Sequence, residues 1–170
     1  STARFLDRIM SLFPSSTSTA GTPLNDVVSA CELPNLQGSQ RLLEHLRFVS
    51  GFRWEGRSPI AYKANEDLPF RDVSRTELIG SAGEQAAFDV RYFDIAPGGH
   101  SSLEKHVHTH VVIGARGSGT LISGDRRLPV EPFDVAYVPP LQVHQLVNHG
   151  AEPFGFFCIV DHDRDRPQKP

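Results

Sequence analysis

The spacing of apolar residues changes near Gly51, from intervals typical of helices to intervals typical of strands. Before that point, apolar positions within residues 2–13 recur every third or fourth place, which predicts a short amphipathic helix. The polar, breaker-rich segment 14–23, PSSTSTAGTP, is predicted to be a linker. Ser39 can cap a further helix that ends at Gly51. We therefore expect residues 1–50 to form a mostly helical N-terminal extension.

After this point the apolar runs are short, alternating or β-branched, and separated by turn residues. The runs, in order, are AAFDVRYFDI, HVVIGA, GTLISG, FDVAYVP, HQLVN and FGFFCIV. Strands separated by turns about every eight to twelve residues are typical of an antiparallel sandwich or barrel. Gly124 and Asp125 fit the tip of a hairpin. We expect one all-β domain over residues 51–165, without a helix after residue 70, and a charged tail at 166–170.

Composition narrows the class of partners more than it narrows the function. The 170 residues, 39% of them hydrophobic, suit a single globular domain. A net charge of −3, with the basic residues scattered along the chain, argues against nucleic-acid or anionic-membrane partners. No apolar run approaches the ~20 residues that span a bilayer, and the first residues make a poor secretory signal. We expect a cytoplasmic protein.

Four histidines and a glutamate lie within the eleven residues from His100 to His110. If residues 104–112 form a strand, alternate side chains share one face. That face would carry Glu104, His106, His108 and His110. Four ionisable groups would be costly in a dry core, whereas imidazole and carboxylate are good ligands for a divalent transition metal. A further ligand must come from another strand, and His144 in VPPLQVHQLVN is the candidate. Solvated histidines on an exposed strand are the alternative.

These segments resemble the paired motifs of the cupin family, small β-barrels of the jelly-roll type, also called double-stranded β-helices. The first motif is Gly, five residues, His-x-His, three or four residues, Glu, six residues and Gly. Gly98 and Gly117 fit its two glycines. In this register the His pair falls on Glu104 and His106, and the Glu position falls on His110. The swap retains a set of three imidazoles and one carboxylate once His144 is included.

The second motif is Gly, five residues, Pro-x-Gly, two residues, His, three residues and Asn. It falls on Phe133, Pro139, Leu141, His144 and Asn148. Proline, histidine and asparagine match, whereas both glycines are replaced. A different register of the first motif, with His106 and His108 as the His pair, would put Val112 or Ile113 at the carboxylate position, where neither can bind a metal.

The resemblance implies one divalent transition metal held by Glu104, His106, His110 and His144. Iron, manganese or copper is favoured, and zinc or nickel is an alternative. His108 could replace Glu104 as a ligand, or it could line the pocket and shuttle protons.

Four protein ligands on a six-coordinate ion leave two positions for a bidentate substrate, or for substrate and dioxygen. We therefore expect a dioxygenase-type oxidoreductase, similar to quercetinase-like cupins in its ligand set, that acts on a small oxygenated molecule. Glu104 or His108 would be the general base. The alternatives are a metal-dependent isomerase or epimerase of a sugar or keto acid, and a non-catalytic cupin that binds a small molecule. The apolar N-terminal helix favours a homodimer.

Overall fold

The computed structural model describes residues 45–63 and 68–170, and this part of the chain is built from strands. The strands are β1 (Ile60–Ala61), β2 (Arg71–Ile79), β3 (Phe88–His100), β4 (His110–Arg116), β5 (Gly119–Ser123), β6 (Arg126–Val130), β7 (Val135–Val138), β8 (Gln145–Val147) and β9 (Phe154–Asp161). The described ranges contain no helix, and so none that could cross a membrane. The all-β prediction is confirmed for this part of the chain.

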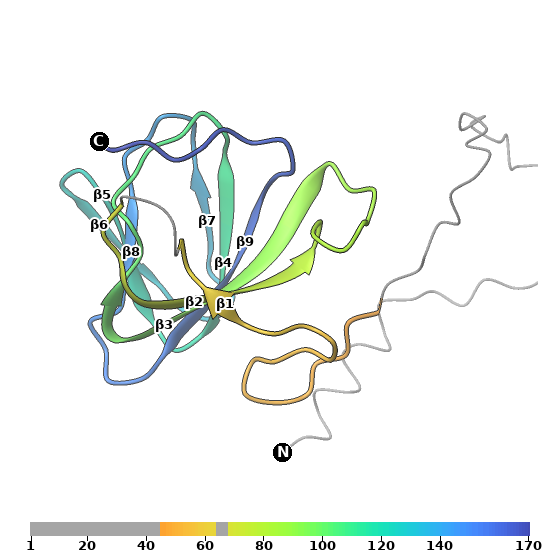
Figure 1. Ribbon diagram of the computed structural model, residues 1–170. Coiled ribbons are helices and arrows are strands. Elements are labelled where there is room, and N and C mark those ends of the chain that lie inside the picture. Colours follow the sequence, from red (N-terminus) through yellow and green to blue (C-terminus); the bar gives the residue numbers. More distant parts are fainter. Residues whose placement is uncertain (1–44, 64–67) are drawn as a thin grey trace, which may run out of the picture. The chain divides into compact units, whose positions relative to one another are not determined.

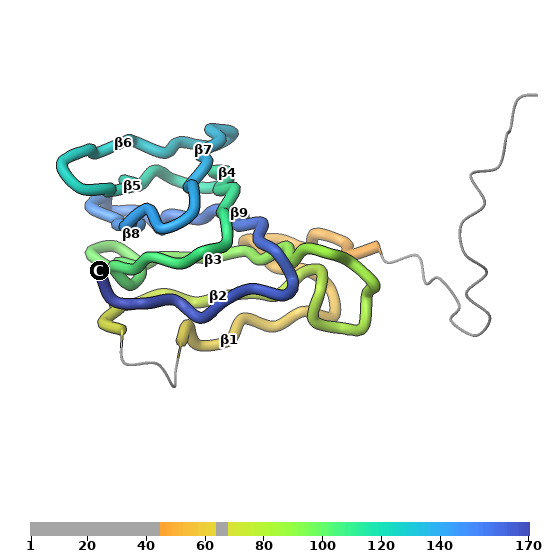
Figure 2. The backbone as a smooth tube through the Cα atoms, turned by 90° about the horizontal axis from the view of Figure 1, so that it is seen from above, coloured from red at the N-terminus to blue at the C-terminus, as the bar shows by residue number. Residues whose placement is uncertain are grey.

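The strands form one antiparallel sheet that curls around a central space (Figure 1). Its order is β6-β5-β8-β3-β9-β4-β7, and β2 joins it by pairing with β3 and carries β1 on its other side. Figure 2 shows β5 and β6 at one side of the molecule and β1 and β2 at the other. The C-terminal stretch after β9 passes across one end of the barrel (Figure 1). That end carries the candidate site.

An apolar core fills the space between the strands and ends where polar side chains begin. The core includes Phe93, Ile95, Val112 and Leu146. Because strand side chains alternate, His110 points to the same face as Val112, and His144 to the same face as Leu146. Each of these two histidines is thus the next inward-facing residue along the chain from an apolar core residue. The polar side chains therefore lie directly next to the apolar core, at one end of the barrel.

The predicted strand over residues 104–112 is only partly correct. Strand β4 begins at His110, and residues 101–109 form a loop held by two isolated bridges, one of Glu104 with His144 and one of Lys105 with Gln168. The alternation of burial nevertheless persists through this loop, because Val107 is exposed while the ionisable side chains on either side of it are buried. The two bridges hold this loop in an extended form, so that its side chains alternate between inward and outward directions as they would in a regular strand.

The helix predicted to end at Gly51 is wrong over residues 45–50. This stretch is not helical, and Phe48 pairs with Trp54 across a turn at Gly51 and Phe52, where both backbones adopt positive φ. The rings of Phe48 and Trp54 lie 5.8 Å apart, so aromatic packing outweighs the helical spacing. The rest of the predicted extension, with its linker at 14–23, lies outside the described residues.

The turns of both motifs share a left-handed backbone, although only the first motif has glycines there. Gly98 and Gly117 have φ of 75° and 56°. Phe133 and Leu141, which replace the glycines of the second motif, have φ of 74° and 60°. A side chain in this region costs roughly 1–2 kcal/mol. The fold therefore retains the glycine geometry at two positions where the sequence has lost the glycine.

Candidate metal centre

Three imidazole rings converge at the polar end of the barrel. His106 comes from the loop before β4, His110 is the first residue of β4, and His144 immediately precedes β8. One ring nitrogen from each lies within 4.8 Å of the others. All three side chains are buried, His106 completely. The structure thus brings together three of the four predicted metal ligands from two distant parts of the sequence.

Backbone carbonyls orient two of these rings for metal binding. His106 donates from Nδ1 to the carbonyl oxygen of His108 at 2.7 Å, and His144 donates from Nδ1 to that of Gln142 at 2.8 Å. A proton fixed on Nδ1 leaves the lone pair on Nε2, which is the form that binds a metal. The Nε2 atom of His106 is buried and has no hydrogen-bond partner. A buried nitrogen lone pair without a partner fits a metal ligand well.

Burial keeps the rings neutral, which is the state that a metal requires. It lowers the pKa of His106, of His144 and, most strongly, of His110. For His110, the neighbouring ring of His106 and the positive charge of Arg91 depress the pKa further. Since protons compete with metal ions for imidazole, three rings with lowered pKa values are available to a cation at neutral pH.

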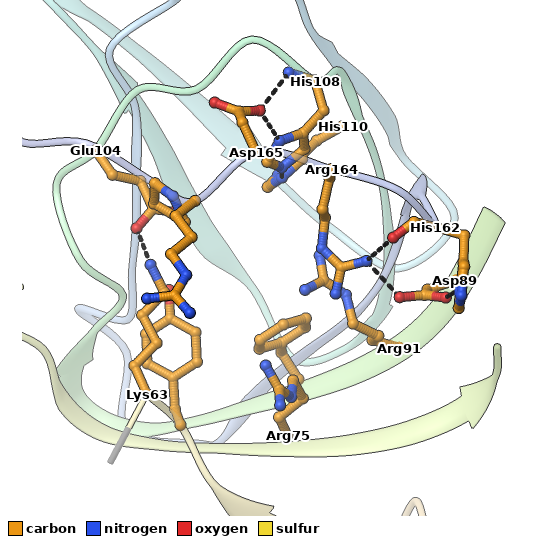
Figure 3. A pocket seen from close by; sticks show the side chains of 14 residues that line it. Lys63, Arg75, Asp89, Arg91, Glu104, His108, His110, His162, Arg164 and Asp165 are labelled. Carbon is orange, nitrogen blue, oxygen red and sulfur yellow. Dashed lines mark hydrogen bonds and ion pairs between the residues drawn. The ribbon is translucent and has the colours of Figure 1, made fainter. Parts of the chain in front are cut away.

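Glu104 lies beside the three histidines, but its carboxylate has other partners. Its backbone N–H and carbonyl pair with those of His144 at 3.1 and 2.9 Å. Its side chain is buried and accepts a hydrogen bond from the ammonium group of Lys63 (Figure 3). It accepts another from the hydroxyl of Ser102. Among residues 45–63 and 68–170, the group of converging ligand atoms therefore consists of imidazoles alone. That Glu104 is a metal ligand stays a prediction.

The ring of His108 is held between the C-terminal stretch and the metal centre. Its Nδ1 lies 2.7 Å from Oδ1 of Asp165, and its Nε2 lies 3.1 Å from Nε2 of His110. The Asp165 carboxylate also accepts the backbone N–H groups of Val107 and His108 at 2.9 and 3.0 Å. Partial burial alone would raise the pKa of Asp165, but these hydrogen bonds lower it well below its usual range. Asp165 thus fixes both the loop and the His108 ring.

A cavity of about 410 Å³ opens beside these residues. Glu104, His108 and His110 line it together with Arg75 and Arg91 from β2 and β3 (Figure 3). Arg164 and Asp165 from the C-terminal stretch also line it. The cavity therefore has room for a small organic molecule between the histidines and a group of guanidinium side chains.

Comparison with known proteins places the chain in a family. Residues 91–160 match the cupin domain family. The chain is 39% identical over 123 residues to 1-methylthio-D-xylulose 5-phosphate methylsulfurylase from Rhodospirillum rubrum, and the match covers 72% of this chain and 78% of that protein. The chain belongs to the cupin family.

Two further comparisons agree that this chain is a cupin. It is 34% identical over 139 residues to a glucose-6-phosphate isomerase from Pyrococcus abyssi, with 75% of this chain and 74% of that protein covered. The crystal structure of a cupin 2 conserved barrel domain protein from Rhodopseudomonas palustris superimposes with a TM-score of 0.68 at 36% identity, covering 75% of this chain and 86% of that chain. The resemblance inferred from the two motifs is confirmed.

Several residues of the cupin's site escaped the sequence analysis. Ser102 lies two positions before Glu104, so the same alternation that grouped the histidines could have found it. Lys63 and Arg91 lie outside both motifs and carry no local signal. Asp165 stands in the tail segment DHDRDRPQKP, where nothing in the sequence separates it from the neighbouring acidic residues.

Proposed function

We propose that this cupin is a metal-dependent enzyme that shifts a proton next to the carbonyl group of a small sugar-like molecule. The observation that carries the proposal is the buried, unpartnered Nε2 of His106, which converges with His110 and His144 beside the cavity. The two relatives support the substrate class, because their names denote enzymes of a xylulose and a glucose derivative. This is the isomerase alternative of the sequence analysis.

The histidines would hold one divalent ion, with Glu104 as the predicted fourth ligand. Such an ion, when bound, would supply a Lewis acid for a substrate carbonyl. Glu104 and His108 both line the cavity and can accept a proton. Lys63 and Ser102 fix the first, and Asp165 fixes the second. Glu104→Gln separates the two roles of the carboxylate, since loss of metal identifies a ligand, and retained metal with lost activity identifies a base.

The experiment begins with metal analysis of protein purified without chelators or nickel resin. Proton exchange is then followed by NMR in D₂O on D-xylulose 5-phosphate and D-glucose 6-phosphate, with manganese, iron, zinc or nickel supplied. We expect metal-dependent deuterium incorporation next to the carbonyl, lost in His144→Ala and retained in His149→Ala, which changes an exposed histidine. Stoichiometric metal without exchange on these and related ketoses would refute the proposal.

The dioxygenase expected from the ligand set stays a prediction, because neither relative named above is described as an oxygenase. Oxygen uptake with flavonols, enediols and catechols tests it on the same metal-loaded samples. Uptake without proton exchange would favour the dioxygenase over the isomerase.

We also keep the homodimer as a proposal. Strand β7 lies at one edge of the sheet, and Phe133, Val135 and Tyr137 in and before it are 88%, 68% and 62% exposed. Apolar side chains along an open edge support self-association. Light scattering with Tyr137→Lys tests it, and an unchanged mass would remove this edge from consideration. The cytoplasmic location and the absence of nucleic-acid and membrane partners stay predictions.

A further inference from the structure

Arg91 places a permanent positive charge inside the barrel. It shares the inward face of β3 with Phe93 and Ile95, is 8% exposed, and lies with its guanidinium carbon 5.2 Å from the centre of the Phe93 ring. One terminal nitrogen donates to Sγ of Cys158 at 3.3 Å, and Nε has no hydrogen-bond partner. Within residues 45–63 and 68–170, no carboxylate forms an ion pair with Arg91. A buried charge in this state is costly unless a ligand completes it.

Arg75, on the neighbouring strand β2, adds a second positive charge beside Arg91. It lies opposite Phe93 in the β2–β3 ladder, whereas Glu77 lies opposite Arg91, so the two arginines are diagonal neighbours on one face. Glu77 accepts a hydrogen bond from Arg75 at 2.9 Å, but Nε of Arg75 is buried and unpartnered. Burial lowers the pKa of Arg75; Glu77 opposes this shift, and the charges of Arg91 and Arg164 add to it. Two guanidinium groups therefore face one space with N–H donors to spare.

The acidic groups that line the cavity are already paired. Five lysine and arginine side chains line it against three acidic ones. Each acidic group has a partner: Asp89 binds Arg164, Glu104 binds Lys63, and Asp165 binds His108. None of these three carboxylates is paired with Arg75 or Arg91, which face the same cavity that Glu104, His108 and His110 line (Figure 3). The charge of Arg91 is therefore uncompensated, and that of Arg75 is shared with Glu77.

We propose that Arg75 and Arg91 form an anion subsite for the phosphate group of a phosphate monoester whose carbonyl end reaches the histidines. The inference rests on the proposed function and extends it by naming the charged end of the substrate. Guanidinium groups bind phosphate through paired N–H donors, and two of them on one face can donate to different oxygens of the same phosphate group. A carboxylate offers two oxygens where the phosphate of a monoester offers three, so it would satisfy fewer of these donors.

The test is calorimetric titration of the full chain with inorganic phosphate, D-xylulose 5-phosphate, D-xylulose and acetate. We expect both phosphate compounds to bind, and the free sugar and acetate to bind far more weakly. Arg91→Met should weaken phosphate binding about 10- to 100-fold, the loss typical of a charged hydrogen bond. Its melting temperature without phosphate should be unchanged or higher, because an unpaired buried charge is removed. Arg127→Met, on exposed β6, is the matched control and should retain wild-type affinity.

The outcomes separate this subsite from the proposed function. Phosphate that binds Arg91→Met and wild type equally, or acetate that binds as tightly as phosphate, overturns the subsite even if metal-dependent proton exchange is found. Phosphate binding that depends on Arg91 supports the subsite even if no exchange is found. If Arg91→Met does not fold, Arg75→Gln supplies the same comparison from a less buried position, and an unchanged phosphate affinity there overturns the subsite.

Discussion

The cavity has two walls that differ in what their nitrogen atoms offer. One is the histidine wall, in which His110 lines the cavity and the rings of His106 and His144 converge with it without lining the cavity themselves. It presents neutral rings with lone pairs. The arginine wall, formed by Arg75 and Arg91, presents charged groups with N–H donors. Each wall includes at least one buried nitrogen without a partner. One end of a barrel can therefore carry both lone pairs suited to a cation and N–H donors suited to an anion, provided that the two groups of side chains are separate.

The walls also differ in how they are held. Backbone carbonyls fix two of the histidine rings, and Asp165 adds a tie from the C-terminal stretch through His108. The arginines are placed by the β2–β3 ladder, with Phe93, Cys158 and Glu77 as their contacts. The histidine wall therefore depends on several separate segments and the arginine wall on one pair of strands. Changes far along the chain should disturb the first more than the second.

The largest expected effect is on metal affinity, when a substitution in the histidine wall is compared with one in the arginine wall. His106→Asn removes an imidazole from the three converging rings, and we expect metal affinity to fall by more than about 100-fold, beyond the 10- to 100-fold that is typical of residues that only orient a ligand. Arg91→Met should cause no such loss of metal affinity, and should raise it slightly if anything, because it removes a positive charge that acts on His110. Competition with a chelator of known affinity measures both. An equal loss in the two variants would show that the walls are a single electrostatic unit.

Asp165→Asn tests the support of the histidine wall from the C-terminal stretch. The carboxylate accepts three hydrogen bonds from Val107 and His108, and an amide can accept fewer of them while keeping its size. We expect metal affinity to fall about 10- to 100-fold, with a lower melting temperature and no change in phosphate binding at the arginine wall. Asp163→Asn in the same stretch is the control. Wild-type metal affinity in Asp165→Asn would mean that the tie is dispensable.

The sequence predicted the histidine wall better than it predicted the arginine wall, for a physical reason. The histidines lie at alternate positions or at a motif position, so periodicity and motif spacing are enough to predict that they lie close together. Arg91 shares the inward face of β3 with Phe93 and Ile95, but it belongs to no motif, so nothing in the sequence marks it as a site residue. Lys63 reaches Glu104 across 41 positions, and Asp165 reaches His108 across 57. Contacts of this range depend on closure of the barrel, which periodicity does not encode.

The same limit explains the errors in the fold. The all-β class followed from the alternation and the turn residues, but the strand predicted over 104–112 became a loop for most of its length, because its partners are single bridges from His144 and Gln168. The helix expected to run to Gly51 gave way to the pairing of Phe48 with Trp54. In both cases a tertiary contact outweighed a local pattern.

Mild acid, above the pH range in which carboxylates titrate, should weaken the apoprotein through the histidine wall, since arginines do not titrate there. Burial lowers the pKa values of the three rings below the usual value near 6.5, so on acidification the unfolded chain takes up protons that the folded chain refuses. The free energy of unfolding should therefore fall as the pH drops from about 6.5. His162, beside Asp89, has a raised pKa and opposes this trend, but it is exposed.

Urea unfolding with a chelator present, at several pH values on both sides of the usual histidine pKa, measures this dependence. His144→Gln should flatten the slope, because one of the three shifted rings is gone, whereas His149→Gln should leave it unchanged. Saturating metal should steepen the loss on acidification, since the protons that the imidazoles take up displace the bound metal. Stability that is constant or rises on acidification would contradict the neutral state of the histidine wall.

The smallest expected effect concerns backbone strain next to the histidine wall. Leu141 has φ of 60° and a half-exposed side chain, and its N–H donates to the carbonyl of His106 at 2.7 Å. Leu141→Gly relieves the left-handed strain but also removes apolar contacts, so Leu141→Ala is the proper reference. Both variants keep the hydrogen bond to His106. We expect the glycine variant to be more stable than the alanine variant by about 1 kcal/mol in urea unfolding. If alanine is as stable as glycine, the backbone there is not strained, and the hydrogen bond to His106 alone accounts for the position of the loop.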